Sequence, residues 1–276
     1  MNIRISAINP AHNLLKTAVP FKSQNDTAKS NLLREPKNDT FEMSIGYVND
    51  THGQTNNMMR ILSGIKGDLR LSAGDNDIGD EKNTAVHKAT YKFLNLAGVK
   101  ATALGNHELD TTQADLMNSL KDYDGDVLVV NLDKEDIEDQ DLQEVKQYGR
   151  APLEEVLKTS KVVEIKGEKI GILGASPSDI FDRLTHIKYH TDCKVADLDE
   201  TIDDIQEEVN KLKSQGVNKI VLLSHLGHKR DQEVAKNTEG IDVIIGGHTH
   251  ELVEGTEEGK NLFYSKTGEW RRIHAI

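Results

Sequence analysis

Five short apolar runs of this chain each end at a cluster of aspartate, asparagine or histidine residues. The runs cover residues 43–48, 69–73, 99–104, 220–223 and 241–245. Apolar runs of this length that stop at turn-forming residues are typical of buried strands. In open α/β sheets, ligands bind beyond the carboxyl ends of the strands, so clusters up to about 200 residues apart in the chain are predicted to meet in space.

The residues in these clusters carry the oxygen and nitrogen ligands that divalent cations prefer. The clusters read Asn49-Asp50-Thr51-His52, Gly74-Asp75-Asn76, Gly105-Asn106-His107-Glu108, Ser224-His225 and Gly246-Gly247-His248-Thr249-His250. Taken singly, each cluster is as well explained by turn formation or by an exposed histidine. Their joint occurrence at five strand ends favours a cage for two cations.

His107 and Asp110 lie three residues apart, a spacing at which two side chains meet across one helical turn. The Asp110 carboxylate would then fix the tautomer of the His107 ring and favour its protonated form. The other ring nitrogen would be left to contact a substrate. The alternative is that Asn106 caps a helix and that the residues after it are merely exposed.

From residue 41 onward, apolar strands alternate with helical segments, which predicts an α/β fold with a largely parallel sheet and helices packed outside it. Helices are expected over residues 84–97 and 199–215, the second ended by Gly216. Residues 161–165 and 169–173 are predicted to form a hairpin around Lys166-Gly167-Glu168. Residues 1–40 show no periodicity, so we expect a disordered tail there and one folded domain over residues 41–276.

The composition excludes several classes of function. A formal net charge of −12 without any run of basic residues argues against nucleic acid as a partner. Cys193 is the only cysteine, so the sequence offers neither an intramolecular disulfide nor a thiolate metal cluster. Apolar runs long enough to cross a membrane or to act as a signal segment are absent, so we expect a cytoplasmic protein without a membrane partner. These patterns do not specify an oligomeric state.

The order of the motifs resembles that of the calcineurin-like metallophosphoesterases, and in particular the branch of bacterial 5′-nucleotidases and UDP-sugar hydrolases. The motifs are Asp-x-His at 50–52, Gly-Asp at 74–75, Gly-Asn-His-Glu-Leu-Asp at 105–110, Ser-His at 224–225 and Gly-Gly-His-Thr-His at 246–250. The resemblance covers roughly residue 41 to the end. It implies a four-layer α-β-β-α sandwich of two mixed sheets with helices outside, and two divalent cations (zinc, manganese, iron or cobalt).

The resemblance also implies a role for each candidate residue. Asp50, His52 and His250 would hold one cation, Asn106, His225 and His248 the other, and Asp75 would bridge the two. A hydroxide between the cations would attack phosphorus. His107, oriented by Asp110, would stabilise the charge that develops on the phosphoryl oxygens or the leaving group.

The resulting expectation is a metal-dependent, 5′-nucleotidase-like phosphomonoesterase that acts on a small phosphate ester, with a nucleotide as the expected substrate. Two alternatives stay open. One is a phosphodiesterase or pyrophosphatase acting on cyclic nucleotides or nucleotide sugars, and the other is a metal-bound interaction module without catalysis. Two-domain relatives add a C-terminal domain that binds the nucleobase, which we expect this chain to lack, and they commonly carry an aspartate where this chain has Ser72.

Overall fold

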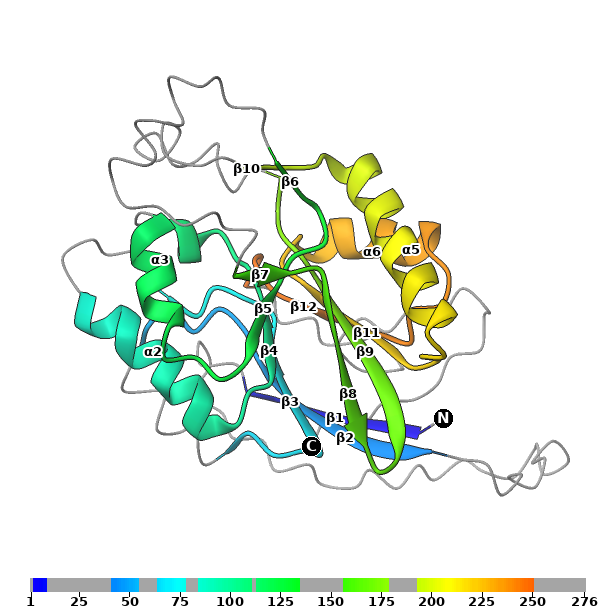
Figure 1. Ribbon diagram of the computed structural model, residues 1–276, viewed down its shortest axis with the longest axis horizontal. Coiled ribbons are helices and arrows are strands. Elements are labelled where there is room, and N and C mark those ends of the chain that lie inside the picture. Colours follow the sequence, from blue (N-terminus) through cyan, green and yellow to red (C-terminus); the bar gives the residue numbers. More distant parts are fainter. Residues whose placement is uncertain are drawn as a thin grey trace, which may run out of the picture.

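The computed structural model of the protein describes residues 2–8, 41–54, 64–77, 84–110, 113–134, 156–178 and 193–250. These residues form two large β-sheets that pack face to face, with helices on the two outer faces (Figure 1). The four-layer α-β-β-α sandwich implied by the resemblance is therefore confirmed.

The larger sheet has six strands in the order β1-β2-β3-β4-β5-β7. They are β1 (Asn2–Ile8), β2 (Glu42–Val48), β3 (Leu69–Ser72), β4 (Ala101–Ala103), β5 (Asp126–Leu128) and β7 (Leu157–Lys158). Every described pairing in this sheet is parallel. Among the described strands, the mixed pairing expected of both sheets is therefore not found in this one. Its parallel neighbours are joined by crossovers rather than by tight turns.

Strand β1 pairs with β2 from Asn2 opposite Glu42 to Ile8 opposite Val48. The disordered tail expected over residues 1–40 therefore does not include this strand, and residues 9–40 lie outside the described residues. The segment has alternating apolar residues at Ile3 and Ile5, a period-two pattern that suits a strand at the edge of a sheet.

The second sheet has four strands in the order β12-β11-β9-β8. They are β8 (Ser160–Ile165), β9 (Glu168–Ala175), β11 (Ile220–Ser224) and β12 (Val243–Gly246). β8 and β9 form the predicted antiparallel hairpin, and its turn residues Lys166 and Gly167 have φ values of 52° and 80°, as a type I′ turn requires. The other two pairings are parallel, so this sheet is mixed. A separate two-stranded ribbon joins β6 (Leu132–Lys134) to β10 (Cys193–Val195).

The described helices cover the outer faces of the two sheets (Figure 1). They are α2 (Thr84–Ala97) and α3 (Gln113–Leu120) on the larger sheet, and α5 (Leu198–Ser214) and α6 (His228–Asn237) on the smaller one. α2 matches its predicted range. α5 begins one residue earlier than predicted, because Asp197 caps it by accepting a hydrogen bond from the backbone N–H of Glu200. Gly216, with φ 80°, follows the end of α5 as predicted, and the Val217 N–H bonds back to the Leu212 carbonyl.

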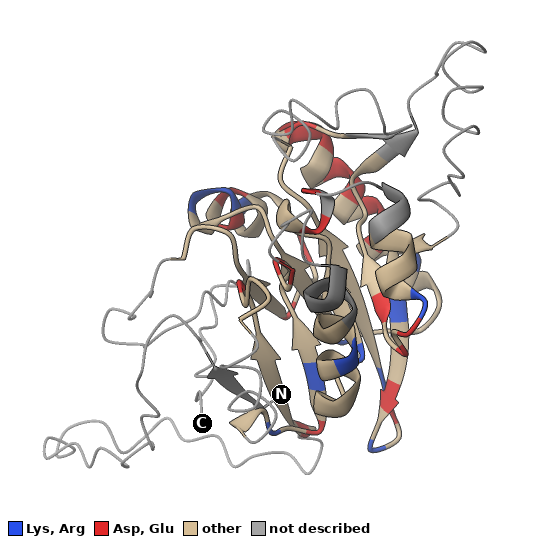
Figure 2. Cartoon of the chain, turned by 90° about the vertical axis from the view of Figure 1, so that its left-hand side faces the viewer, with Lys and Arg blue, Asp and Glu red and all other residues tan. Residues whose placement is uncertain are grey.

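Three groups of buried apolar side chains join the layers. The first lies between the two sheets and combines residues of both, such as Ile45 and Leu71 with Ile172 and Leu223. The second lies under α2 and α3, and the third under α5 and α6. Because most strands are covered on both faces, charged residues lie mainly on the helices and at the strand ends (Figure 2). No described helix has the length and hydrophobicity of a membrane span. The cytoplasmic location stays a prediction.

Candidate metal centre

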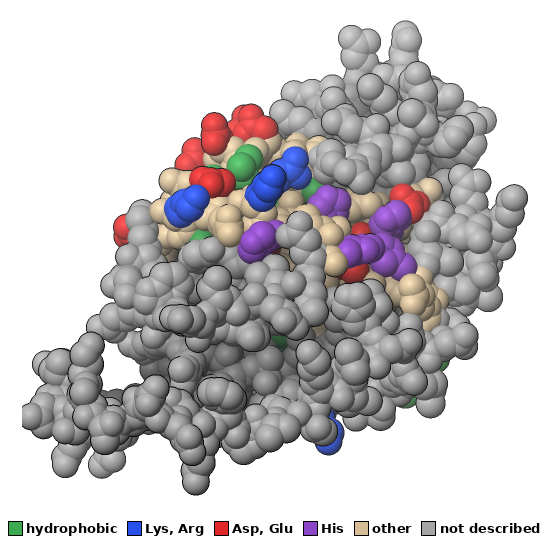
Figure 3. Space-filling model, turned by 180° about the vertical axis from the view of Figure 1, so that it is seen from behind, with side chains coloured by type: hydrophobic (Ala, Val, Ile, Leu, Met, Phe, Trp, Pro, Cys, Tyr) green, Lys and Arg blue, Asp and Glu red, His purple; other side chains and the backbone are tan. Residues whose placement is uncertain are grey.

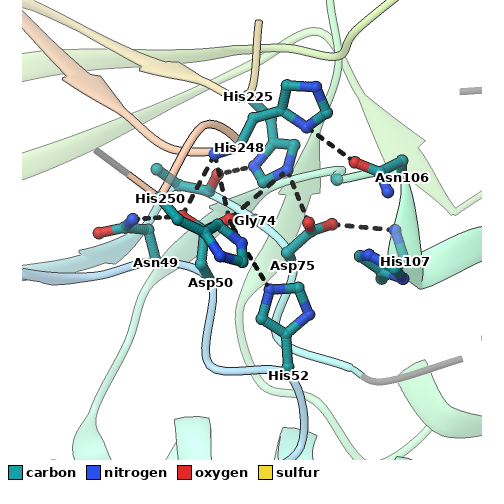
Figure 4. Close-up of polar contacts among 12 residues, drawn as sticks. Asn49, Asp50, His52, Gly74, Asp75, Asn106, His107, His225, His248 and His250 are labelled. Atoms are coloured by element: carbon teal, nitrogen blue, oxygen red, sulfur yellow. Dashed lines mark hydrogen bonds and ion pairs between the residues drawn. The ribbon is translucent and has the colours of Figure 1, made fainter. Parts of the chain in front are cut away.

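The five predicted clusters lie next to one another at the carboxyl ends of their strands (Figure 4). The larger sheet supplies residues from the loops after β2, β3 and β4, and the smaller sheet supplies residues from the loops after β11 and β12. In this order they are Asp50, His52, Asp75, Asn106, His107, His225, His248 and His250. Asp110 joins them through His107. The structure thus brings together every site residue predicted from the sequence.

One group of candidate ligands consists of Asp50, His52 and His250. Nε2 of His52 lies 2.9 Å from Nε2 of His250, which in turn lies 3.3 Å from Oδ1 of Asp50. The carboxylate of Asp50 is buried, and it accepts hydrogen bonds from the backbone N–H of His248 at 3.1 and 3.2 Å and from the side-chain amide of Asn49. The ligand atoms of the group all lie within 4.8 Å of one another, close enough to share one cation.

A second group consists of Asp75, His225 and His248, again within 4.8 Å of one another. Nε2 of His225 lies 2.9 Å from Oδ2 of Asp75. Oδ1 of Asn106 lies 2.9 Å from Nδ1 of His248, and the Asn106 side chain makes no helix-capping hydrogen bond. The capping alternative for Asn106 is therefore wrong. Asp75 also forms a third group with His52 and His107, so its carboxylate reaches both sides of the site.

The orientation of His225 is the clearest indication of a metal ligand. Its ring is fully buried, and Nδ1 lies 2.6 Å from the carbonyl oxygen of Ala73, a contact in which the nitrogen must be the donor. The other nitrogen, Nε2, is buried and faces the carboxylate of Asp75, 2.9 Å from Oδ2. Metal-binding histidines are usually fixed in this way, with one nitrogen on a backbone carbonyl and the other toward the cation. The side chains present therefore fit a divalent cation.

The side chain of His107 contacts that of Asp110, as their spacing in the sequence predicts. His107 opens the short 3-10 helix η1 (His107–Leu109), and its Nδ1 contacts Oδ2 of Asp110. This hydrogen bond raises the pKa of His107 against the opposing effect of burial. The ring lies edge-on to His52, with 4.8 Å between the ring centroids.

One side of the site is open to solvent. The side chains of His107 and His250 are 37% and 50% exposed, whereas that of His225 is 0% exposed. Histidine side chains accordingly gather on one face of the molecule (Figure 3). Solvent therefore reaches the centre from the side of His107 and His250.

Five of the candidate ligands have a left-handed backbone conformation. The φ values are 50° at Asp50, 46° at His52, 52° at Asp75, 79° at His248 and 53° at His250. Such residues cost on the order of 1 kcal/mol or more each, and they concentrate at functional sites. The local backbone is therefore shaped for the site at the expense of stability.

Two glycines let the loops approach His225 closely. A Cβ at Gly74, which has φ 90°, would lie 2.9 Å from Nδ1 of His225, and a Cβ at Gly247 would lie 3.0 Å from the same atom. Gly74, with its left-handed φ, makes a sharp turn. Gly247 lies outside the left-handed region, which His248 and His250 adopt instead, so it provides space rather than a turn.

Sequence reasoning assigned no specific role to four buried polar residues that surround the centre. They are Asn76, Glu108, Ser224 and Asp231. Glu108 accepts hydrogen bonds from backbone N–H groups of two loops, and the Ser224 hydroxyl donates to Asp231. The Ser72 hydroxyl donates to Oδ1 of Asn76 at 2.7 Å. The available signal was their position within or near the motifs, which gives no indication of where a side chain points.

Burial and close contact shift the pKa values of the charged groups in the centre. Burial alone would raise the pKa of Asp75, but the neighbouring His225 holds it well below its ordinary value. Burial alone would lower the pKa of His225, but Asp75 raises it to about 9. Burial and the Asp75 carboxylate raise the pKa of Glu108 to about 7. Asp75 therefore carries its negative charge directly next to the ring of His225.

Comparisons with known proteins agree with this geometry. A sequence model described as calcineurin-like phosphoesterase matches residues 43–252. The trifunctional nucleotide phosphoesterase protein YfkN of Bacillus subtilis is 28% identical over 255 residues, which make up 82% of this chain and 17% of that protein. A 5′-nucleotidase of Diplobatis ommata is 32% identical over 181 residues, 63% of this chain and 28% of that protein.

A solved structure shares the fold. The crystal structure of a 5′-nucleotidase precursor from Thermus thermophilus is similar with a TM-score of 0.60 and 28% identity, over 75% of this chain and 42% of that one. The chain thus spans less than half the length of each of these three proteins.

Proposed function

The chain belongs to the calcineurin-like phosphoesterase family, and we propose that it hydrolyses phosphate monoesters of nucleotides at a centre of two divalent cations. The observation that carries the proposal is the orientation of the buried His225 ring, whose Nδ1 is held by the Ala73 carbonyl oxygen while Nε2 faces the Asp75 carboxylate. The nucleotide substrate is supported by the names of the similar proteins, which are a nucleotide phosphoesterase and two 5′-nucleotidases.

Seven side chains are proposed to hold the cations. Asp50, His52 and His250 would bind one, Asn106, His225 and His248 the other, and Asp75 would be shared. This division is supported by the two groups of candidate ligands, which separate the histidines in the same way. Carboxylate, amide and imidazole ligands without a thiolate suit zinc, manganese, iron or cobalt. Bound cations neutralise phosphate charge and lower the pKa of coordinated water.

His107 is proposed to contact the phosphate ester. Its Nδ1 is occupied by Asp110, so Nε2 is the atom left to donate a hydrogen bond to a phosphoryl oxygen or to the leaving-group oxygen. The raised pKa of His107 keeps that proton in place. The backbone N–H of His107 donates to Oδ1 of Asp75 at 2.9 Å, which fixes the His107 backbone next to this ligand.

The test is a hydrolysis panel with metal-depleted protein that is reconstituted with zinc, manganese, iron or cobalt, one at a time. The substrates are nucleoside 5′-monophosphates, cyclic nucleotides and nucleotide sugars. We expect two cations per chain and release of inorganic phosphate from the monophosphates. Faster hydrolysis of cyclic nucleotides or nucleotide sugars would replace the monoesterase proposal by the phosphodiesterase alternative. Two bound cations without any hydrolysis would favour the interaction module.

A pair of histidine variants separates the metal centre from its surroundings. His225→Ala is expected to lose cations and activity. His228→Ala is the matched control, because His228 lies three residues further on, pairs with Gln232 at 3.2 Å and belongs to no group of candidate ligands. Equal cation content in the two variants would contradict the proposed ligand set.

A further inference from the structure

The side chain of Glu108 lies beneath the candidate metal centre and has no role in the chemistry described above. Glu108 is the second residue of η1, directly after His107, and only 2% of its surface is exposed. Among the described residues, no Lys or Arg forms an ion pair with it. A buried carboxylate is costly unless hydrogen bonds satisfy it, so its partners indicate what it does.

All hydrogen-bond partners of the Glu108 carboxylate are donors from two loops. Oε1 accepts from the backbone N–H of Asn76 at 2.6 Å and from the Asn76 side-chain amide at 3.3 Å. Oε2 accepts from the backbone N–H of Asp75 at 3.0 Å and from that of Gly105 at 2.7 Å. Both oxygens therefore bind the loop after β3, and Oε2 also binds the loop after β4.

These two loops carry Asp75 and Asn106, which are proposed ligands on different strands. The loops pack so closely that a Cβ at Gly105 would lie 2.2 Å from Oδ1 of Asp75 and 2.7 Å from Oε2 of Glu108. Glycine is thus required where the carboxylate enters between them. The position of Asp75 relative to Asn106 depends on this contact.

Asn76 extends the same network to a third loop. Its carbonyl oxygen accepts hydrogen bonds from the Thr51 hydroxyl at 3.0 Å and from the backbone N–H of Gly53 at 2.8 Å. Its side-chain amide donates to the Thr102 hydroxyl at 2.9 Å. The loop between Asp50 and Gly53, which contains His52, is therefore tied to Glu108 through Asn76. It is also tied through Asp75, whose carbonyl oxygen accepts from the His52 N–H at 3.0 Å.

We propose that Glu108 is the positioning residue of the metal centre, which holds the three ligand loops of the larger sheet in the arrangement that binds cations. This inference rests on the proposed function of the centre. The carboxylate is suited to the task because it only accepts hydrogen bonds, and both of its oxygens face donors. A glutamine of the same shape has one acceptor and one donor, so in either orientation its NH₂ group would face backbone N–H groups.

The experiment compares Glu108→Gln with the wild-type chain in Mn²⁺ binding, measured from the signal of free Mn²⁺ in electron paramagnetic resonance. Partners of metal ligands typically contribute about 10- to 100-fold to affinity, and we expect a loss of that size. We also expect the turnover number at saturating Mn²⁺ to fall while KM changes little. Circular dichroism checks that the variant is folded under these conditions.

The matched control is Glu208→Gln. Glu208 is also a buried glutamate whose carboxylate accepts hydrogen bonds, from Ser160 at 2.6 Å and Lys211 at 2.9 Å, but it lies on α5 away from the ligand loops. We expect it to change Mn²⁺ affinity by less than about twofold, as expected for a group without contact to the ligands. If Glu108→Gln binds Mn²⁺ as tightly as Glu208→Gln, the positioning role is refuted. If the wild-type chain itself binds no Mn²⁺, the proposed function fails instead.

A measurement on the wild-type chain tests the inference if Glu108→Gln does not fold. The backbone amides of Asp75, Asn76 and Gly105 lie in loops, but they donate to a buried carboxylate, so they should exchange hydrogen as slowly as amides of the central strands. The intrinsic exchange rates of the same three amides in an unstructured chain provide the unprotected reference. Exchange of the three amides at the rate of that reference would overturn the proposal.

Discussion

Replacing Asp231 by asparagine is expected to remove a pH-dependent loss of stability. Asp231 lies in the first turns of α6, is 3% exposed, and accepts a hydrogen bond from the Ser224 hydroxyl at the end of β11. Its other oxygen lies against Gly246 at the end of β12, where a Cβ would be 2.4 Å away. Burial raises the pKa of Asp231 from 3.8 to about 7, against the weaker effects of Ser224 and His225.

The sign and size of the effect follow from this shift. The folded state keeps the proton of Asp231 up to about pH 7, whereas the unfolded state loses it near pH 3.8. The stabilising effect of the neutral carboxyl is therefore fully present below pH 3.8 and is lost as the pH rises toward 7. Each pH unit between these values costs about 1.4 kcal/mol, so the loss between pH 5 and pH 8 is about 2 to 3 kcal/mol.

The assay is urea unfolding of the full chain at pH 5 and pH 8 in the presence of a chelator, so that cation binding does not contribute. The substitution Asp231→Asn places an amide next to Gly246, which lowers the unfolding free energy by a similar amount at both pH values. The informative quantity is therefore the change in unfolding free energy between the two pH values, which should be about 2 to 3 kcal/mol smaller in the variant than in the wild type. An identical change in both proteins would refute the reasoning.

Three further substitutions test separate parts of the structure. His107→Ala is expected to keep its cations in metal analysis but to lower the turnover number by on the order of a hundredfold, and an unchanged turnover number would exclude His107 from the reaction. Gly105→Ala places a Cβ 2.2 Å from Oδ1 of Asp75, so we expect loss of bound cation at equilibrium dialysis, which full cation content would contradict. Gly216→Ala, at φ 80° with nothing within 4 Å of the added Cβ, should lower the unfolding free energy in urea by about 1 kcal/mol through backbone strain alone, and no measurable loss would argue against that strain.

Much of the fold was predictable because it depends on local patterns. Apolar residues of α5 recur at Ile205, Val209 and Leu212, which are all buried, and Gly216 supplies the left-handed residue that follows the helix. The hairpin follows from Gly167 in a two-residue turn. In each case the signal lies within one turn or one helix, where sequence spacing and spatial neighbourhood coincide.

The candidate site was predictable as a set of residues but not as an arrangement. The carboxyl ends of parallel strands lie at a common edge of the sheet. Asp75 and Asn106 were therefore expected to lie close together, independently of the exact conformation of their loops. The pairing of β1 with β2 and the contacts of Glu108 and Asp231 depend on which distant backbone groups they meet. No spacing in the sequence encodes those contacts.

The candidate centre draws its side chains from both sheets, with Asp50 and Asp75 on one and His225 and His250 on the other. A cation shared between them is then also a cross-link between the two halves of the core. At a free concentration about one hundred times its dissociation constant, such a cation adds about 2.7 kcal/mol to the stability of the folded chain. On the proposed function, the availability of the metal would thereby affect the stability of the protein as well as its rate of hydrolysis.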